Sequence, residues 1–228
     1  MSERGWFGSY RRGEVGGRRF AITFDDGPLP GATDAILDTL AELRAPATFF
    51  VIGRAAERWP ALVKRMHDDG HTVANHTYDH WRHAMWRGVW YWQEQIERTD
   101  LVIERIIGRR PAMFRPPFGV RTPINKWVIH RSGHACVMWT RRAMDGVRTT
   151  PEKIERRLLA TAADGDVLVL HDGRELKSTR DFMPTVRALP RVIRAFRERG
   201  LEPSPLPRLL GIDAYRPLVP SPGSPGGG

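Results

Sequence analysis

The sequence predicts a parallel α/β fold of the barrel type, built as a single domain. Three observations lead to this prediction. Short apolar runs alternate with longer segments of helical periodicity, and repeated strand-helix units of this kind form parallel sheets. Each polar cluster suited to chemistry directly follows an expected strand. The 228 residues, 41% of them hydrophobic, are enough for one sizeable core.

The expected strands are short apolar runs bounded by turn residues. They cover residues 20–24, 47–52, 72–74, 113–115, 135–139 and 166–170. The expected helices place their apolar residues on one stripe, as crossover helices between parallel strands do. They cover residues 33–43, 60–69, 92–107, 152–162 and 185–199. Gly70 and Gly200 end the second and the last of them.

The two ends of the chain are expected to lie outside the catalytic body. Residues 1–17 are rich in Gly and Arg without periodicity, which predicts a poorly ordered lead-in. Residues 203–228 are rich in Pro, Gly and Ser, and the last of them cannot bury enough apolar area to fold alone. The central domain is therefore expected to span residues 18–202.

The chain is basic, with a formal net charge of +10 from 36 Lys+Arg against 26 Asp+Glu. The arginines are spread along the sequence, so the surface would attract polyanions without being built to read them. A polyanion-binding protein is one alternative that this charge suggests. No Gly-rich phosphate loop, zinc finger or concentrated basic stripe supports it, and no specific nucleic-acid partner is expected.

Cysteine usage and apolar runs bear on the compartment. The single cysteine, Cys136, has no partner for an internal disulfide and is expected to fill the core. Residues 1–17 lack the apolar run of a secretory signal, and the sequence has no stretch of about 20 apolar residues. The expectation is a cytoplasmic protein without a transmembrane segment; the sequence indicates no oligomeric state.

Two polar clusters suggest a divalent metal site. Asp25 and Asp26 end the first apolar run, and His76 and His80 follow the third expected strand, four residues apart. The histidines can face one ion if their segment forms a helical turn. Imidazole and carboxylate suit a divalent ion that activates water. If one aspartate binds the ion, its neighbour is free to act as a general base.

Both clusters have a structural alternative. The histidine pair is also consistent with an exposed His80 and a His76 that caps a helix. The two aspartates are consistent with an ordinary strand-end turn of the Asp-Gly kind. That alternative is less economical, because two acids after a buried run are costly to desolvate unless something positive meets them.

Two further strand ends carry candidate catalytic groups. Arg115 precedes two prolines that, with Gly119, fix a rigid loop, and it is placed to keep the base carboxylate charged. His171 ends the last expected strand and suits a general acid that protonates a leaving nitrogen. The alternatives are a proline-stiffened surface turn and a structural histidine.

Together these segments resemble, in order and spacing, the motifs of the NodB-homology polysaccharide deacetylases, carbohydrate esterase family 4. The matching segments are Thr23-Phe24-Asp25-Asp26-Gly27-Pro28, Asn75-His76-Thr77-Tyr78-Asp79-His80, Arg115-Pro116-Pro117-Phe118-Gly119 and Leu168-Val169-Leu170-His171. The resemblance spans roughly residues 19–200. It implies a distorted (β/α) barrel that removes N-acetyl groups from sugar polymers with the help of one divalent ion.

The resemblance also implies roles for individual residues. Asp25 would be the base and His171 the acid, while Arg115 would steady Asp25. The metal ligands would be Asp26, His76 and His80. Two histidines and one carboxylate suit zinc, which is the expected ion, and cobalt or nickel would also fit.

Other residues are expected to contact the substrate. The backbone N–H of Phe118, beside Pro117 in the rigid loop, would help to stabilise the tetrahedral oxyanion. Leu168 or Leu170 would floor a small apolar pocket for the acetyl methyl group.

One motif departs from the family pattern. Where Asp-x-x-Asp-Trp is usual, the segment that begins at Trp139 offers Arg142 for the first acid and Gly146 for the tryptophan. The acid partner of the catalytic histidine is therefore in question, and Asp145 is the candidate. The aromatic wall of the acetyl pocket is expected to be missing, with weaker activity or a different acyl group as the consequence. Trp139 and Asp145 are counted with the substrate pocket.

The favoured hypothesis is a hydrolase that removes N-acetyl groups from a polysaccharide, oligosaccharide or glycolipid sugar by attack of metal-activated water on the amide. The alternative is a catalytically weakened relative that acts as a glycan-binding protein. Tryptophans beyond the second histidine fit either a stacking platform for sugar rings or helix-core packing. They are Trp81, Trp86, Trp90 and Trp92, with Tyr91 among them. The sequence does not choose between chitin-type oligomers, peptidoglycan and a lipid-linked sugar.

Overall fold

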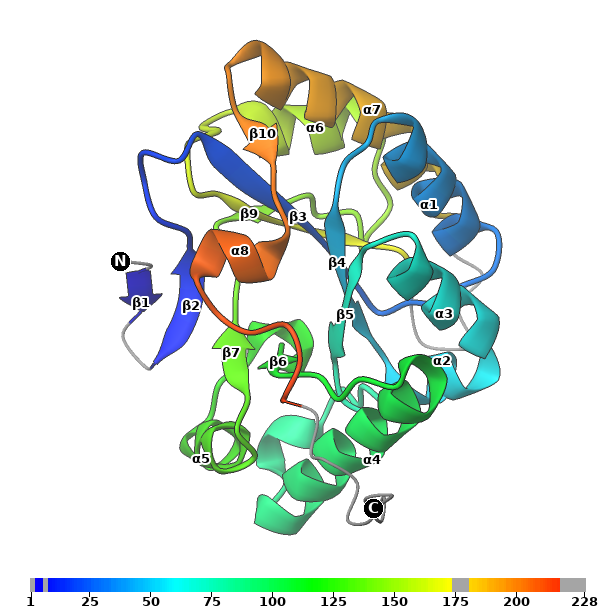
Figure 1. Ribbon diagram of the computed structural model, residues 1–228, viewed down its shortest axis with the longest axis vertical. Coiled ribbons are helices and arrows are strands. Elements are labelled where there is room, and N and C mark those ends of the chain that lie inside the picture. Colours follow the sequence, from blue (N-terminus) through cyan, green and yellow to red (C-terminus); the bar gives the residue numbers. More distant parts are fainter. Residues whose placement is uncertain (1–2, 6–7, 174–180, 218–228) are drawn as a thin grey trace, which may run out of the picture.

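The computed structural model describes residues 3–5, 8–173 and 181–217. Its centre is a curled sheet with the strand order β1-β2-β7-β6-β5-β4-β3-β9-β8, and β10 pairs with β3 at one end. Every pairing is parallel except that of β1 with β2. In Figure 1 the strands surround a central space and most of the helices lie outside them. The predicted α/β barrel is confirmed, and it is distorted because β2 and β8 form no ladder with each other within the described chain.

The strands are short, as predicted. They are β1 (Glu3–Gly5), β2 (Ser9–Arg12), β3 (Arg19–Asp25), β4 (Ala47–Val51), β5 (Thr72–Asn75), β6 (Met113–Phe114), β7 (Ala135–Val137), β8 (Arg141–Arg142), β9 (Val167–His171) and β10 (Glu202–Pro203). Each expected strand has a counterpart, but the fourth ends at Phe114, so Arg115 lies in the loop that follows β6. The sequence did not predict β1, β2, β8 and β10.

The helices include five at the expected positions and three that were not expected. They are α1 (Ala32–Glu42), α2 (Gly53–Arg58), α3 (Pro60–Asp68), α4 (Val89–Ile107), α5 (Pro123–Arg131), α6 (Pro151–Leu159), α7 (Met183–Glu198) and α8 (Leu206–Leu210). Two 3₁₀ turns, η1 (Ala84–Trp86) and η2 (Pro117–Gly119), lie in loops. The unexpected helices are α2, α5 and α8.

Side chains on the two faces of the strands form separate cores, because successive residues of a strand point to opposite faces. In β3, Phe20, Ile22 and Phe24 pack against the outer helices, whereas Ala21 points into the barrel. The inward-facing side chains of the other strands meet the leucines of α8. They are Phe50, Ala74, Met113, Val137 and Val167, packed with Leu206, Leu209 and Leu210.

The ends of the chain contribute more to the barrel than expected. Beyond residue 202, α8 lies in the middle of the ring of strands in Figure 1 and buries three leucines there. In front of residue 18, β2 pairs with β7, and the Gly13 N–H donates to the Gly165 carbonyl at 2.8 Å. An open parallel barrel must cover its apolar interior, and these short segments do so. The remaining parts of the expected lead-in and tail, residues 1–2, 6–7 and 218–228, lie outside the described residues.

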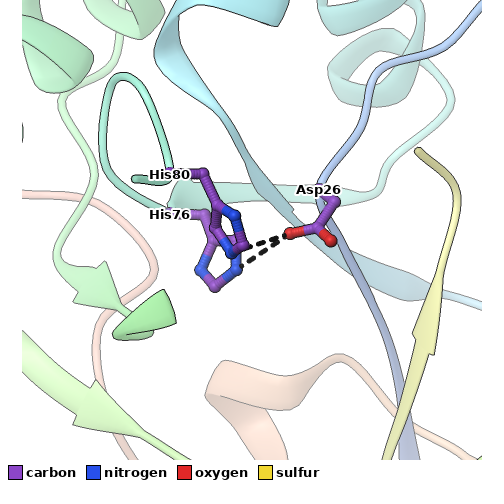
Figure 2. A group of neighbouring side chains, drawn as sticks. All are labelled: Asp26, His76 and His80. Carbon is purple, nitrogen blue, oxygen red and sulfur yellow. Dashed lines mark ion pairs between the residues drawn. The ribbon is translucent and has the colours of Figure 1, made fainter. Parts of the chain in front are cut away.

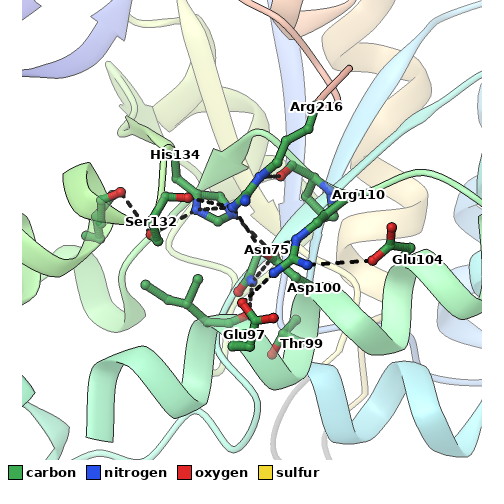
Figure 3. Close-up of polar contacts among 12 residues, drawn as sticks. Asn75, Glu97, Thr99, Asp100, Glu104, Arg110, Ser132, His134 and Arg216 are labelled. Atoms are coloured by element: carbon green, nitrogen blue, oxygen red, sulfur yellow. Dashed lines mark hydrogen bonds and ion pairs between the residues drawn. The ribbon is translucent and has the colours of Figure 1, made fainter. Parts of the chain in front are cut away.

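A buried polar network joins the C-terminal segment to the strand that leads to the first candidate metal-binding histidine (Figure 3). At its centre is Asp100 of α4, whose side chain has no exposed surface. One of its oxygens accepts from Asn75 Nδ2 at 2.7 Å and lies 3.2 Å from His134 Nε2. The other lies 3.2 Å from Arg216 Nη2 and 3.4 Å from Arg110 Nε. The network therefore connects the end of β5 to Arg216.

Two expectations from composition can be compared with the fold. Cys136 is buried among apolar side chains, where burial raises the pKa of its thiol to about 11. Among the helices that the structure describes, none is long and apolar enough to cross a membrane.

Candidate active site

Asp26, His76 and His80 point toward one another at the carboxyl ends of β3 and β5 (Figure 2). Nε2 of each histidine lies 3.2 Å from Oδ1 of Asp26. One possible ligand atom from each residue lies within 4.8 Å of those of the other two. The three side chains are almost wholly buried. Such a set of one carboxylate and two imidazoles has the composition and convergence of a catalytic metal site.

The histidine segment is a loop and not the helical turn that the sequence analysis required. Asn75 begins it, and its side-chain oxygen accepts from the Thr77 N–H at 2.9 Å. The N–H groups of Tyr78 and Asp79 then donate to Oε1 of Gln95 on α4, at 3.0 and 2.9 Å. Side-chain acceptors thus replace the helical hydrogen bonds and turn both histidines to the same side.

The backbone around the site is strained. Asp26, Thr77, His80 and Phe118 have positive φ angles of 75°, 70°, 52° and 57°, which residues other than glycine rarely adopt. Such conformations persist where the surrounding structure imposes them, and they gather at functional sites. At these positions they turn the chain directly at the candidate ligands.

The protonation states fit a divalent ion. Nδ1 of His76 lies 2.7 Å from the Arg115 carbonyl, so a proton on Nδ1 donates there and leaves the lone pair of Nε2 facing Asp26. Burial lowers the pKa of His80 to about 4, which keeps that ring neutral. Burial opposes a charge on Asp26, but His80, His76 and His171 together lower its pKa below the ordinary value. Oδ1 of Asp26 is buried and forms no hydrogen bond within the described chain, an orphaned acceptor that a cation would satisfy.

Asp25 turns away from this cluster and toward Arg115. Nη1 of Arg115 donates to Oδ1 of Asp25 at 2.6 Å and to Thr23 Oγ1 at 2.8 Å. The other guanidinium nitrogens donate to the carbonyls of Val137 and Met138, so the fully buried arginine is held from several sides. The second oxygen of Asp25 lies 4.0 Å from His76 Nε2. The carboxylate is therefore fixed in place beside the metal ligands.

His171 ends β9 on the other side of the pocket, paired with Asp145. Its Nδ1 lies 2.7 Å from Oδ1 of Asp145, and its backbone N–H donates to Oδ2 at 2.9 Å. Thr185 also donates to Oδ2, which fixes the orientation of the carboxylate. Burial favours the neutral imidazole, but Asp145 outweighs it and raises the pKa of His171 to about 10. Asp145 is thus the acidic partner of His171, the partner that was in question because this segment departs from the family motif.

Asp172, which the sequence analysis did not single out, holds the aspartate turn from behind. Its Oδ1 accepts from the Gly27 N–H at 3.1 Å and its Oδ2 from Thr33 Oγ1 at 2.8 Å. Complete burial raises the pKa of this carboxyl to about 7, with Asp26 and Asp25 adding to the effect. A β-carbon on Gly27 would lie 2.1 Å from an oxygen of Asp172. The sequence signal that could have identified Asp172 is its position directly after His171.

These groups share a cavity of about 240 Å³. Its lining includes Asp25, Asp26, His76, His80, Arg82, Phe118, Trp139, Arg142, Met144, Gly146, Val147, Val169, His171 and Gly173. Trp139 and Phe118 therefore line the pocket, as expected of substrate-contacting residues. Asp145 lies behind His171, and Pro117 lines a smaller neighbouring hollow.

The expected floor of the acetyl pocket is wrong. Leu168 and Leu170 are fully buried against the outer helices and do not line the cavity. Val169, between them, faces inward and lines it. Alternation along β9 explains the correction, because Val167 and Val169 share the inner face of the barrel while the two leucines share the outer face.

The tryptophans beyond His80 separate into two groups. Trp92 is 2% exposed and belongs to a core cluster, whereas Trp86 and Trp90 are 83% and 84% exposed. Trp81, partly exposed, packs under the Arg87 guanidinium, whose central carbon lies 4.3 Å from the ring centroid. None of the four lines the catalytic cavity. A sugar platform here would extend beyond the pocket, on the surface near α4.

Comparisons with known proteins bear on the family of the chain and on its fold. The sequence profile described as polysaccharide deacetylase matches residues 12–137. A chitooligosaccharide deacetylase of Bradyrhizobium sp. (strain ANU 289) is 36% identical over 86% of this chain and 93% of its own. A peptidoglycan-N-acetylglucosamine deacetylase of Bacillus cereus is 32% identical over 92% of this chain and 72% of its own. The crystal structure of the Bc1960 peptidoglycan N-acetylglucosamine deacetylase superposes with a TM-score of 0.84 at 28% identity, covering 90% of this chain and 94% of that one.

Proposed function

Because this chain belongs to the polysaccharide deacetylase family, as its motifs indicated, we propose that it is a metal-dependent hydrolase that removes N-acetyl groups from an N-acetylated glycan or glycolipid sugar. The observation that carries the proposal is the convergence of Asp26, His76 and His80 beside a separately held carboxylate and a charged imidazole. The relatives named as chitooligosaccharide and peptidoglycan deacetylases support this class of substrate.

Asp26, His76 and His80 would hold the ion. A divalent ion at this position would polarise the amide carbonyl and lower the pKa of water, and zinc suits the ligand set. The chain supplies the rest of the site. Burial and an unmade hydrogen bond at Asp26 Oδ1 favour a cation there.

Asp25 is placed to take the proton from the attacking water. Its Oδ1 is held by Arg115 at 2.6 Å, and its other oxygen faces the histidine cluster. The contact with the arginine also fixes the orientation of the carboxylate, which a base requires. Further hydrogen bonds of Arg115 to Thr23 and to two backbone carbonyls keep the guanidinium beside Asp25 when substrate is present.

His171 is placed to protonate the leaving nitrogen. With Nδ1 engaged by Asp145, its Nε2 is the ring nitrogen left for the substrate. The raised pKa keeps the imidazole protonated at neutral pH, so a proton is available when the C–N bond breaks. Water adds to the carbonyl carbon, the nitrogen leaves as an amine, and acetate forms. No covalent enzyme intermediate is needed.

The test is acetate release from N-acetylglucosamine oligomers, peptidoglycan and lipid-linked sugars, with and without a chelator. The matched variants are His76→Ala and His130→Ala, the second at an exposed position on α5. His76→Ala should lose bound metal and activity together, whereas His130→Ala should keep both. Unchanged release from metal-free protein would contradict the proposal.

The alternative of a weakened, glycan-binding relative was prompted by Arg142 and Gly146 in the departing motif. The position of Asp145 against His171 now favours the catalytic function over this alternative. The two are distinguished by Asp25→Asn. If the protein is an enzyme, this change abolishes acetate release while the protein remains fully loaded with metal. If it is a glycan-binding protein, no variant changes acetate release, and glycan affinity is the property to compare.

A further inference from the structure

Two arginines stand at the mouth of the catalytic cavity, and they are the basis of the inference. Arg82 and Arg142 are exposed and both line the cavity that contains Asp25 and His171. Within the residues that the structure describes, neither takes part in an ion pair. We propose that Arg82 and Arg142 form an anion subsite that binds a carboxylate or phosphate carried by the substrate close to the N-acetyl group. The inference rests on the proposed function and specifies its substrate class.

Each guanidinium is placed over an aromatic ring. The central carbon of Arg82 lies 5.3 Å from the ring centroid of Phe118, and that of Arg142 lies 5.3 Å from the ring centroid of Trp139. The two rings belong to neighbouring segments, because a β-carbon on Gly119 would lie 2.5 Å from the Trp139 side chain. An arginine stacked on a ring loses less freedom on binding an anion, and its in-plane N–H groups remain free to form a fork with two oxygens.

The two acids that line the cavity face groups other than Arg82 and Arg142. Asp25 is bonded to Arg115, and Asp26 faces the two histidines. His171 is protonated at neutral pH, because Asp145 holds its pKa at about 10, and its charge is paired with that carboxylate. The positive charge left at the rim is therefore that of the two arginines, with which no described acid forms an ion pair. A rim with one sign of charge attracts ligands of the opposite sign.

The arginines flank the reaction centre from two sides. Arg82 lies two residues after the candidate ligand His80, and Arg142 lies on β8, whose neighbour β9 ends in His171. An amide placed between the ligands and His171 would therefore have both guanidinium groups within reach of the same or an adjacent sugar unit. A neutral chitin-type oligomer carries no anion for them to bind, whereas a sugar acid or sugar phosphate does.

The experiment compares matched substrate pairs on the zinc-loaded protein. One pair is an N-acetylglucosamine–N-acetylmuramic acid disaccharide and the same disaccharide with its carboxylate converted to a carboxamide. The other pair is N-acetylglucosamine 1-phosphate and the uncharged methyl glycoside. The two pairs separate carboxylate from phosphate as the source of the charge. We expect kcat/KM to favour the charged member of at least one pair by about tenfold or more, the scale of one charge-assisted contact.

The variants test whether the arginines cause this preference. In Arg82→Gln/Arg142→Gln the ratio of the two kcat/KM values should fall toward one. Arg208→Gln, an equal loss of charge at an exposed position on α8, should keep the ratio. Raising the ionic strength from about 0.02 to about 0.3 M should reduce the wild-type ratio, because salt screens exposed charges.

Equal kcat/KM values for the charged and uncharged members of both pairs would overturn the anion subsite, as would a preference that survives in the double variant. Deacetylation without charge preference defeats this inference alone, whereas absence of deacetylation from every substrate defeats the proposed function. Calorimetric binding of the same pairs to Asp25→Asn protein gives the answer independently of turnover. There too, the charged member should bind more tightly, and only when both arginines are present.

Discussion

At the scale of single residues, His171 depends on one carboxylate. Two bonds from Asp145 hold its ring and its backbone, and the charge of Asp145 outweighs the burial that would otherwise neutralise the imidazole. An acid must be protonated to act, and His171 remains so well above the ordinary histidine pKa of 6.5. The pair also contributes stability that is complete below pH 6.5 and is lost as the pH rises through about 10.

Asp145→Asn should therefore move the alkaline limb of the kcat/KM profile to lower pH. Loss of the negative charge lets burial lower the pKa of His171, so the proton needed by the leaving nitrogen is lost earlier on the alkaline side. A pH–rate profile from pH 5 to 10 makes the comparison. The control is Asp213→Asn, an equal change of charge in the segment that follows α8. An alkaline limb at the same pH in both variants would show that Asp145 does not determine the pKa of His171.

Gly27 has no room for a side chain, because a β-carbon there would fall 2.1 to 2.4 Å from the carboxyl atoms of the buried Asp172. Gly27→Ala should lower the free energy of unfolding by about 2–4 kcal/mol, the range of a severe clash in a packed interior. Gly88→Ala is the control, since a β-carbon there would meet no described atom within 4 Å and the φ of Gly88 is −77°. Urea denaturation measures both, and similar midpoints for the two variants would rule out the clash.

The site residues could be predicted from sequence where residue type alone suggests chemistry. Asp25, Asp26, His76, His80 and His171 each follow an apolar run, and such positions gather at one edge of a parallel sheet. Asp172 was missed because its function depends on a contact with Gly27, 145 residues away in the chain. The choice of Leu168 or Leu170 over Val169 failed for a similar reason, since the sequence does not say which face of β9 points inward.

At the scale of elements, helix α4 holds the loop that carries both histidines. Gln95, one of its buried residues, accepts from two successive backbone N–H groups of that loop and donates to Asp79. The helix therefore replaces the local hydrogen bonds that a helical turn would have supplied. The geometry of His76 and His80 depends on a side chain that lies outside the metal-binding motif.

Gln95→Ala should weaken metal binding about tenfold, the lower end of the range for residues that orient metal ligands. Without its acceptor the loop has two unpaired N–H groups, and the histidines no longer stay convergent. Gln93→Ala, an exposed position on the same helix, is the matched control. Zinc competition with a chelating dye measures both affinities. Equal affinities would mean that the loop holds its shape without α4.

Length helps to explain which helices were found from the sequence, although it does not decide it alone. The five expected helices each have nine or more residues, but α5, also with nine, was missed. Helix α8 has five, Leu-Pro-Arg-Leu-Leu, and β8 consists of two arginines. Neither shows a recognisable sequence pattern. Helix α8 is stabilised by packing its leucines inside the barrel, and β8 by pairing with β9. Such elements follow from tertiary contacts, which a local pattern does not contain.

At the scale of the whole molecule, the Asp100 network ties the C-terminal segment to the catalytic side of the sheet. Arg216 reaches Asp100, and Asp100 holds Asn75, the residue before His76 (Figure 3). The carboxylate is completely buried and needs all its partners. The far end of the chain thus stabilises the start of the histidine loop.

Arg216→Gln should lower the free energy of unfolding by about 1–3 kcal/mol, since Asp100 loses one charged partner but keeps Arg110, His134 and Asn75. Arg208→Gln, with the same change in net charge at an exposed site, should remain within about 0.5 kcal/mol of the wild type. Chemical denaturation compares the two. Equal stability of both variants would show that the ion pair with Asp100 contributes nothing.

Helix α8 fills the barrel beneath the reaction centre, and this has a consequence for the order in which the products leave. Because leucines and inward side chains fill the barrel below the cavity, the part of the chain that the structure describes leaves no rear exit for a product released deep in that cavity. Free acetate would have to wait until the much larger amino sugar moves off the rim. Acetate should therefore behave as a competitive inhibitor against the glycan in steady-state kinetics, and a purely noncompetitive pattern would reveal a second way out.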